Sequence, residues 1–250
     1  MPPPAKSLRW LVALTTLLAT PLLAAKTQVA VAANFTEPAR DIAAAFEKAT
    51  GHQAILSFGA SGAFYTQISH GAPFEILLSA DADRPARAER EGLAAPGTRF
   101  TYAVGQLALW SSTPGFVDPK GAVLNRGNFE KIAIADPATA PYGVAAIETM
   151  RKLNLHDRLK PKIVTGSSIA QTFQFTSTGA AQLGFVALSQ VIASKGGSHW
   201  VVPARLHAPI VQQAVLLKTG SSNPAAIAFL RYLKSRPALA IIRRYGYSSR

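Results

Sequence analysis

The chain has 250 residues, of which 48% are hydrophobic and 16% charged, and it contains no cysteine. This apolar content favours a globular protein of one or two domains and excludes a disordered chain. The lack of cysteine excludes disulfides and thiolate metal sites and argues against a lipid anchor. The formal charge is +13, but the basic residues are scattered, so we expect no nucleic-acid binding and interpret the charge as a basic surface that can steer anions.

Residues 1–25 have the pattern of an export signal. Lys6 and Arg9 form a basic start, an apolar segment follows over Trp10–Leu23, and Leu23-Ala24-Ala25 resembles a cleavage site. A membrane-spanning helix needs about 20 apolar residues, so we expect a signal that is cleaved near residue 25 and a periplasmic protein. Without Lys6 and Arg9, the 24 basic and 13 acidic residues that remain give a charge of about +11.

Two apolar runs, each followed by a turn and a helix, begin the expected fold. Val29–Ala33 precedes Asn34 and a helix that ends at Gly51, and Ala54–Phe58 precedes a turn and helix at Ser61. Asn34 and Ser61 stand where helix N-caps are expected. Two helix N-termini at the carboxyl ends of parallel strands favour an anion site, and the lack of charge at both turns favours binding by neutral donors over catalysis.

The alternation continues along the chain. Ile76–Ser79 is expected to be a buried strand, Arg84–Glu91 a polar helix and Val104–Ser111 one long strand. The segment Thr113–Asn128 is rich in proline, glycine and asparagine, so we expect a loop there.

A second block repeats the scheme of strand, turn and helix. Its expected elements, with the turn residues between them, are strand Ile132–Ala135, the turn to Tyr142, helix Val144–Leu153, strand Ile163–Thr165, the turn to Ile169, helix Ala170–Thr176, strand Leu183–Ala187 and a helix through Ser194. This pattern predicts an α/β fold with mainly parallel sheets flanked by helices, in two lobes with a cleft between them.

The last part of the chain is expected to return to the first lobe. A strand at Val211–Leu217 precedes helices at Ala225–Ser235 and Ala238–Tyr245. We expect Val104–Ser111 and Val211–Leu217 to cross between the lobes. The predicted division is therefore lobe 1 at 26–105 with a return at 211–250, and lobe 2 at 106–210.

Six segments together carry a resemblance to a known family. They are VAVAANFTEPARD at 29–41, SFGASG at 57–62, GAPFEILLSAD at 71–81, ADPATAPYG at 135–143, LGFV at 183–186 and RYGY at 244–247. In this order they resemble the periplasmic molybdate-binding proteins of ABC importers, over essentially the whole mature chain. The segment at 71–81 is the most specific single match, although many members have Asp where this chain has Glu75.

The resemblance implies a periplasmic binding protein of type II, whose two lobes close at a hinge around molybdate or tungstate. It implies that Asn34 and Ser61 donate to the oxyanion by side chain and backbone, and that Tyr142 and Ile169 donate backbone N–H groups. Many members have a binding tyrosine where this chain has Ala187, and the Tyr142 hydroxyl is a candidate replacement. The implied partners are the oxyanion and the permease of an importer, with no cofactor and a monomeric protein.

Other functions remain open from the residues alone. A site made only of donors requires a fully deprotonated ligand, which disfavours phosphate but leaves sulfate as an alternative to molybdate. An enzyme or an effector-sensing domain on the same fold is a further alternative. The five histidines are widely spaced, and no GxSxG, GxxxxGK[ST] or GxGxxG segment is present. Asp81, Asp83 and Asp136 are expected to stabilise turns and helix starts rather than to act in acid–base chemistry.

Overall fold

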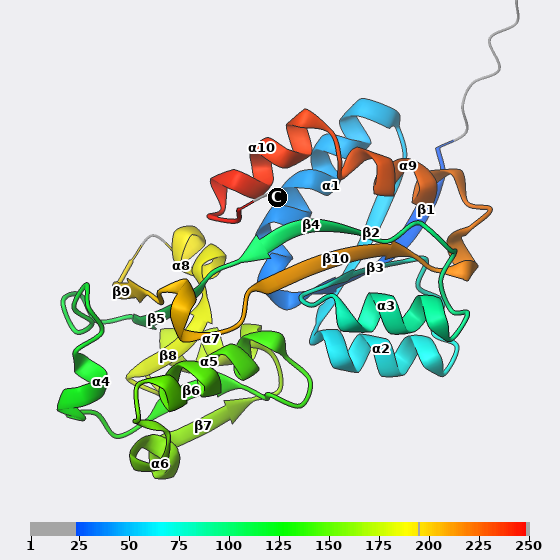
Figure 1. Cartoon of the computed structure of the whole chain (residues 1–250). Coiled ribbons are helices and arrows are strands. Elements are labelled where there is room, and N and C mark those ends of the chain that lie inside the picture. The colour runs from blue at the N-terminus through cyan, green and yellow to red at the C-terminus, as the bar shows by residue number, and fades with distance from the viewer. Residues whose placement is uncertain (1–23, 195, 249–250) are drawn as a thin grey trace, which may run out of the picture.

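The computed structural model describes residues 24–194 and 196–248. Nearly all of the expected export signal therefore lies outside the described residues. The described chain forms two five-stranded sheets, each flanked by helices, in two lobes that lie side by side (Figure 1). The α/β fold with two lobes that the sequence predicts is confirmed.

The first sheet has the strand order β2-β1-β3-β10-β4. Its strands are β1 Lys26–Ala32, β2 Gln53–Gly59, β3 Ile76–Ser79, β4 Phe100–Gly105 and β10 Ile210–Leu216. Its helices are α1 Thr36–Thr50, α2 Ser61–Ser69, α3 Asp83–Arg90, α9 Pro224–Tyr232 and α10 Arg236–Arg244. Helices α1, α9 and α10 cover one face of this sheet, and α2 and α3 cover the other.

The second sheet has the strand order β7-β6-β8-β5-β9. Its strands are β5 Leu107–Ser111, β6 Ile132–Ala135, β7 Ile163–Gly166, β8 Leu183–Ala187 and β9 Ser198–Val201. Its helices are α4 Val123–Arg126, α5 Pro141–Lys152, α6 His156–Leu159, α7 Ile169–Ser177 and α8 Leu188–Ser194.

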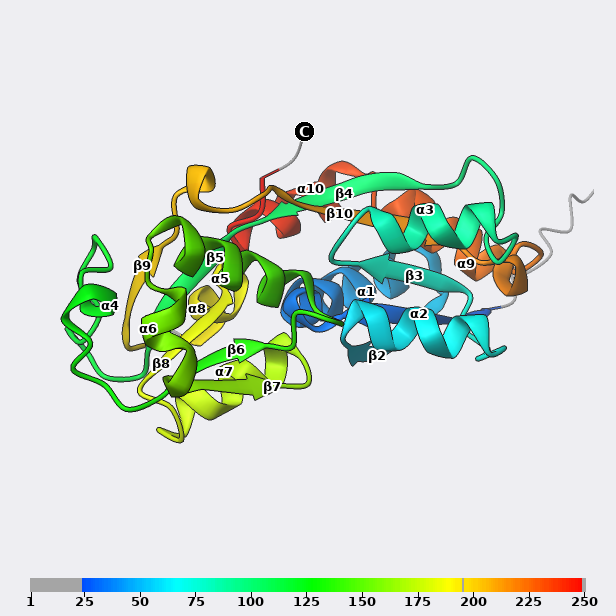
Figure 2. The ribbon, with the colours of Figure 1, turned by 60° about the horizontal axis from the view of Figure 1, so that its bottom comes forward.

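Each sheet is mainly parallel, as expected. In the first sheet only β10 runs against the other four strands, and in the second only β5 does. The carboxyl ends of β1 and β2 therefore meet at one edge of the first sheet, and those of β6 and β7 meet at one edge of the second. These two edges face each other across the gap between the lobes (Figure 2).

The connections between the lobes differ from the expectation. The predicted strand Val104–Ser111 is wrong as one element, because Gln106 separates β4 in the first sheet from β5 in the second. The predicted crossing strand Val211–Leu217 corresponds to β10, which lies wholly in the first sheet. The chain returns from the second lobe in the segment between β9 and β10. The expected loop at Thr113–Asn128 contains the short helix α4.

The hydrophobic core explains why the repeated pattern folds as it does. In α1 the apolar positions Ala39, Ile42 and Phe46 are fully buried against the first sheet. In the second lobe Met150 of α5 is fully buried in the cluster that contains strands β6 and β8. Most of each core lies within one lobe, and the small residues Ala32, Ala33 and Ala80 of the first lobe extend the second lobe's cluster across the gap.

Two further features are absent from the described part of the chain. None of its helices combines the length and apolar character needed to span a membrane. Nor do three or more of its histidine and acidic side chains cluster where they could hold a metal ion.

Candidate functional site

A small cavity lies where the two lobes meet. Its lining comes from both sheets' facing edges and consists of Ala32, Ala33, Asn34, Gly59, Ala60, Ser61, Ala80, Ala140, Pro141, Tyr142 and Ile169. The structure thus brings together all four residues that the sequence singled out, and it does so in a closed arrangement of the lobes.

Ser61 is the first residue of α2 and is only 1% exposed. The expected N-cap role is wrong, because Ala60 occupies the cap position and no side-chain cap bond forms. Instead the Ser61 Oγ accepts a hydrogen bond from the backbone N–H of Ala80 at 2.9 Å. Because a hydroxyl has one proton and two lone pairs, this bond leaves the Ser61 proton available for a ligand in the cavity.

Asn34 lies in a 3₁₀ turn, Ala33–Phe35, between β1 and α1, and it is 2% exposed. Its expected N-cap role is also wrong, since Phe35 holds the cap position. The Asn34 Nδ2 donates to Gln212 Oε1 at 2.9 Å and to Tyr247 OH at 3.0 Å. Both amide protons are therefore used within the protein, in contrast to the expectation that this side chain donates to the ligand.

Tyr142 and Ile169 reach the cavity from the second lobe. Tyr142 is the second residue of α5, and Ile169 is the first residue of α7, whose N-cap Ser168 accepts from Gln171. Backbone N–H groups in the first turn of a helix have no partner within the helix. Both positions can therefore offer a backbone donor, strengthened by the positive end of the helix dipole.

Ala187 stands where many family members have a binding tyrosine, and the Tyr142 hydroxyl is its candidate replacement. Ala187 is fully buried at the end of β8, and its N–H donates to Gln190 Oε1 at 3.0 Å. The Tyr142 hydroxyl accepts from Gln212 Nε2 at 3.2 Å. This hydroxyl lies so close to Gly105 that a Cβ there would be 2.2 Å away, so it is engaged at the junction of the lobes.

Charged side chains lie beside the cavity and not in it. We call the place where Gly62 and Arg84 of lobe 1 meet Ala138 and Thr139 of lobe 2 the mouth of the cavity. Among the described residues, those that line the cavity are all uncharged. Arg84 of α3 pairs with Asp81 and donates from Nη2 to the Ala138 carbonyl of the other lobe at 3.2 Å. A second bond between the lobes joins the Gly62 N–H to the Thr139 carbonyl at 2.9 Å. These bonds close the mouth directly beside Ser61.

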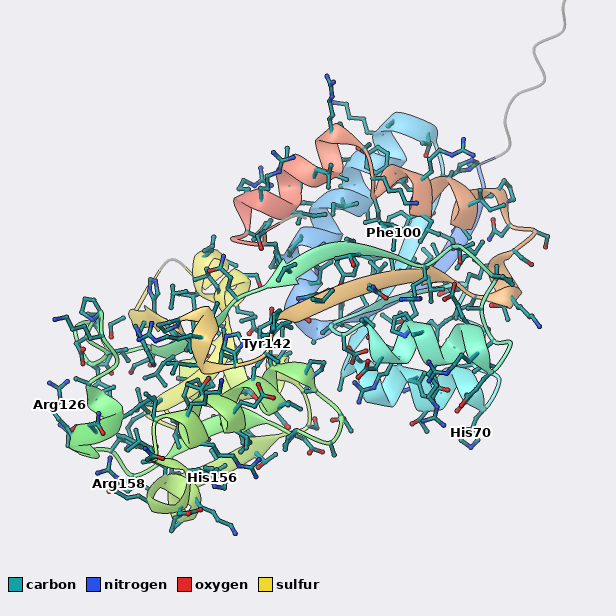
Figure 3. The ribbon with its side chains drawn as sticks, in the orientation of Figure 1. His70, Phe100, Arg126, Tyr142, His156 and Arg158 are labelled. Atoms are coloured by element: carbon teal, nitrogen blue, oxygen red, sulfur yellow. The ribbon has the colours of Figure 1, made fainter. Side chains whose placement is uncertain are left out.

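Sequence reasoning singled out Asn34 and Tyr142 but missed that they belong to a buried set of polar residues. We name it the hinge network: Asn34, Tyr102, Tyr142, Ser189, Gln212 and Tyr247. Figure 3 shows Tyr142 where the lobes meet. Burial raises the pKa of Tyr247 to about 12 and holds the pKa values of Tyr102 and Tyr142 well above the ordinary tyrosine value. Deprotonation of these three hydroxyls is therefore harder than that of an exposed tyrosine, and all three are protonated at neutral pH. Two signals were available in the sequence: the glutamines that interrupt the apolar run Val211–Leu217, and the segment RYGY at 244–247, which contains Tyr247.

Asp81 and Asp136 have the roles expected of them. Asp81 Oδ1 accepts from the backbone N–H of Arg84 at 2.9 Å, near the start of α3. Asp136 Oδ1 accepts from the N–H of Ala138 at 2.9 Å in the turn before α5. Both carboxylates stabilise turns next to the cavity and neither lines it.

Comparison with known proteins gives consistent matches over almost the whole chain. The model of the bacterial extracellular solute-binding protein family matches residues 27–248. The molybdate-binding protein ModA of Rhodobacter capsulatus is 58% identical over 230 residues, which are 92% of this chain and 91% of the relative. The molybdate-binding protein ModA of Azotobacter vinelandii is 55% identical over 234 residues, covering 92% of this chain and 93% of the relative.

A solved structure agrees with these sequence matches. The periplasmic molybdate-binding protein of Azotobacter vinelandii superposes with a TM-score of 0.87 at 42% sequence identity, covering 90% of this chain and 99% of that chain. The similarity therefore includes both lobes and the segments that line the cavity.

Proposed function

Because the chain belongs to the bacterial extracellular solute-binding protein family, we propose that it binds molybdate or tungstate in the periplasm and delivers it to the permease of an ABC importer. The observation that carries this proposal is the meeting of Asn34, Ser61, Tyr142 and Ile169 at one uncharged cavity between the lobes. The molybdate-binding names of relatives at 58% and 55% identity support the choice of ligand. Molybdate is then the cargo of a monomeric binding protein and not a cofactor.

Each residue has a defined part in this proposal. Ser61 donates its hydroxyl proton and backbone N–H from lobe 1. Tyr142 and Ile169 donate backbone N–H groups from the first turns of α5 and α7. Asn34 acts through its backbone, because its side-chain amide is already bonded to Gln212 and Tyr247. We take 26–105 with 211–250, and 106–210, as the two bodies that move on closure.

Neutral donors can hold a dianion if there are enough of them. Burial of an uncompensated ion costs on the order of tens of kcal/mol. Hydrogen bonds to a charged group contribute about 1.5–3 kcal/mol each, and helix N-termini add about 0.3–2 kcal/mol each. Such a shell offers no acceptor for a ligand O–H, so it selects oxyanions that are fully deprotonated near neutral pH. Phosphate retains a proton there and is disfavoured.

Calorimetric titration with molybdate, tungstate, sulfate and phosphate tests the proposal. We expect tight binding of the first two and weak or no binding of the others. Sulfate has the same charge and shape as molybdate, so only the size of the closed cavity separates them. Sulfate binding as tight as molybdate binding would contradict the proposed ligand, and turnover of a substrate would favour an enzyme.

A further inference from the structure

We propose that Gln212, Ser189 and Tyr247 are positioning residues that hold the closed lobes together through Asn34 and thereby set how fast the bound oxyanion leaves. This role depends on the proposed oxyanion site, but none of the three residues lines the cavity. They act from the side of Asn34 that faces away from the ligand.

Gln212 is the centre of the hinge network and is fully buried in β10. Its Oε1 accepts from Asn34 Nδ2 and from Tyr102 OH, both at 2.9 Å. The pairing of β10 with β4 shifts register between Gln212 and Gln213, and Tyr102 is the extra residue in β4. Bulges of this kind re-aim side chains and are frequent beside functional sites. Here the irregularity turns Tyr102 toward Gln212.

Two residues of the second lobe join this network across the gap. Ser189 of α8 donates from Oγ to the Asn34 carbonyl at 2.7 Å, and its Oγ lies 3.1 Å from Tyr247 OH. Gln212 Nε2 donates to Tyr142 OH at 3.2 Å. Asn34 is thus bonded to the second lobe directly through its backbone and indirectly through Gln212. The 3₁₀ turn Ala33–Phe35 therefore both lines the ligand cavity and is bonded by the hinge network.

Gly105 shows how tightly this junction is packed. It is the last residue of β4, next to the crossing at Gln106, and a Cβ added there would lie 2.2 Å from Tyr142 OH and 2.6 Å from Gln212 Nε2. A side chain at this position would displace the bond between Gln212 and Tyr142. The absence of a side chain at residue 105 therefore allows the hinge network to span the lobes.

The network suits a contact that must form and break repeatedly. All its side chains are uncharged at neutral pH, and burial raises the pKa values of its tyrosines further above the ordinary value. When the lobes separate, water can replace each lost partner, so a single bond changes the balance of closed and open states by only about 2- to 13-fold. Several such bonds favour closure without preventing opening.

Release kinetics separate this role from an ordinary structural one. The Asn34 carbonyl accepts from Ser189 Oγ and from Tyr247 OH, both at 2.7 Å. Ser189→Ala removes the first of these bonds, and Tyr247→Phe removes the second but keeps the ring that packs edge-on to Phe35. We expect each variant to release molybdate about 3- to 10-fold faster than the parent in stopped-flow displacement, with an unchanged ratio of molybdate to sulfate affinity. Ser194→Ala is the matched control, because this exposed serine of α8 bonds only locally to the Val191 carbonyl.

Spin labels give a second measurement that needs no ligand. Because the chain has no cysteine, Gln67→Cys on α2 and Gln174→Cys on α7 place one label on each lobe at exposed positions. We expect Ser189→Ala and Tyr247→Phe to shift the distance distribution toward open forms. Release rates equal to those of the parent in both variants would overturn the proposal. If the parent binds no molybdate, the proposed function is wrong, and the distance distributions alone decide: a shift supports the hinge role and identical distributions reject it.

Discussion

The two lobes bring different chemistry to the same cavity. Lobe 1 brings the Ser61 hydroxyl and the backbone of Asn34, whose side-chain amide is bonded to Gln212 and Tyr247, whereas lobe 2 lines the cavity with Ala140, Pro141, Tyr142 and Ile169. The one polar side-chain group from lobe 2, the Tyr142 hydroxyl, is bonded to Gln212 at the hinge. Lobe 2 is therefore left with backbone donors. It follows that ordinary side-chain substitution can test lobe 1, while lobe 2 has to be tested by changes to the backbone or to closure.

The largest expected effect comes from blocking the approach of the lobes at Gly62. A Cβ at this position would lie 2.9 Å from Thr139 Cα and 3.1 Å from the Thr139 carbonyl oxygen in the other lobe. We expect Gly62→Val to weaken molybdate binding by about 3 kcal/mol or more, or at least about 100-fold, as measured by calorimetry.

A graded series identifies the cause as steric. Gly62→Ala should have a smaller effect than Gly62→Val, and neither should lower the free energy of unfolding much, because alanine and valine are better helix formers than glycine. If both variants bind as the parent does, the lobes do not close at Gly62 and Thr139 when ligand is bound.

The hinge network between the lobes predicts a loss of stability at alkaline pH. Burial raises the pKa of Tyr247 to about 12, above the value of about 10 expected when unfolded. The stabilisation is fully present below about pH 10. Between about pH 10 and pH 12 the unfolded chain releases a proton that the folded chain keeps, so the free energy of unfolding falls as the pH rises. A shift of this size corresponds to about 2–3 kcal/mol. Chemical unfolding at pH 9 and pH 11 should show a smaller fall for Tyr247→Phe than for the parent; an equal fall would contradict the assignment.

Lobe 2 can be tested at Ile169 by removing one backbone donor. Ile169 is the first residue of α7, where proline is well tolerated, and Ser168 before it is extended, with φ −152° and ψ 167°. Ile169→Pro should therefore keep the helix while it removes the N–H. We expect binding to weaken by about 1.5–3 kcal/mol, or about 10- to 150-fold. Ile169→Val keeps the N–H and most of the packing, so it controls for the lost side chain. Equal affinities for the two variants would exclude this donor.

Lobe 1 is tested by the side chain of Ser61. Ser61→Ala removes the hydroxyl donor and also leaves the Ala80 N–H without its acceptor. We expect molybdate affinity to fall by about 1.5 kcal/mol, or about 10-fold, and the free energy of unfolding to fall by about 1 kcal/mol. Ser69→Ala, at the exposed end of the same helix, loses only local bonds, to the Thr66 carbonyl and to the ring of His70, and should change neither quantity. A stability loss without an affinity loss would assign Ser61 a purely structural role.

The sequence predicted the cavity better than it predicted the hinge, for a physical reason. Strand, turn and helix are local patterns, and the carboxyl ends of parallel strands meet at one edge, so Asn34, Ser61, Tyr142 and Ile169 could be placed together. The hinge network is built from distant residues: Gln212 and Tyr247 are 178 and 213 positions from Asn34. No periodicity connects them.

The same limit explains the errors in the strands. The run Val104–Ser111 is apolar throughout apart from Gln106 and Ser111, so nothing local marks the point where the chain passes from one sheet to the other. The short strand β9, Ser198–Val201, begins with the polar residues Ser198 and His199, so it does not stand out as an apolar run as the four-residue strands β3 and β6 do. The N-cap prediction failed because Asn34 and Ser61 found tertiary partners, in Gln212 and Tyr247 and in Ala80, which local sequence does not report.

The smallest expected effect comes from Arg84, the charge at the mouth on lobe 1. Its guanidinium is paired with Asp81 and partly exposed, so its net attraction for an anion is small and screened by salt. Arg84→Gln should lower the association rate of molybdate about 2- to 5-fold at low ionic strength, with little difference at high salt. Arg243→Gln, an exposed cation on α10 at the opposite face of the first sheet, is the control. A rate loss that persists at high salt would mean that Arg84 acts through its bond to the Ala138 carbonyl of lobe 2, so the mouth would belong to the closure machinery and not to electrostatic steering.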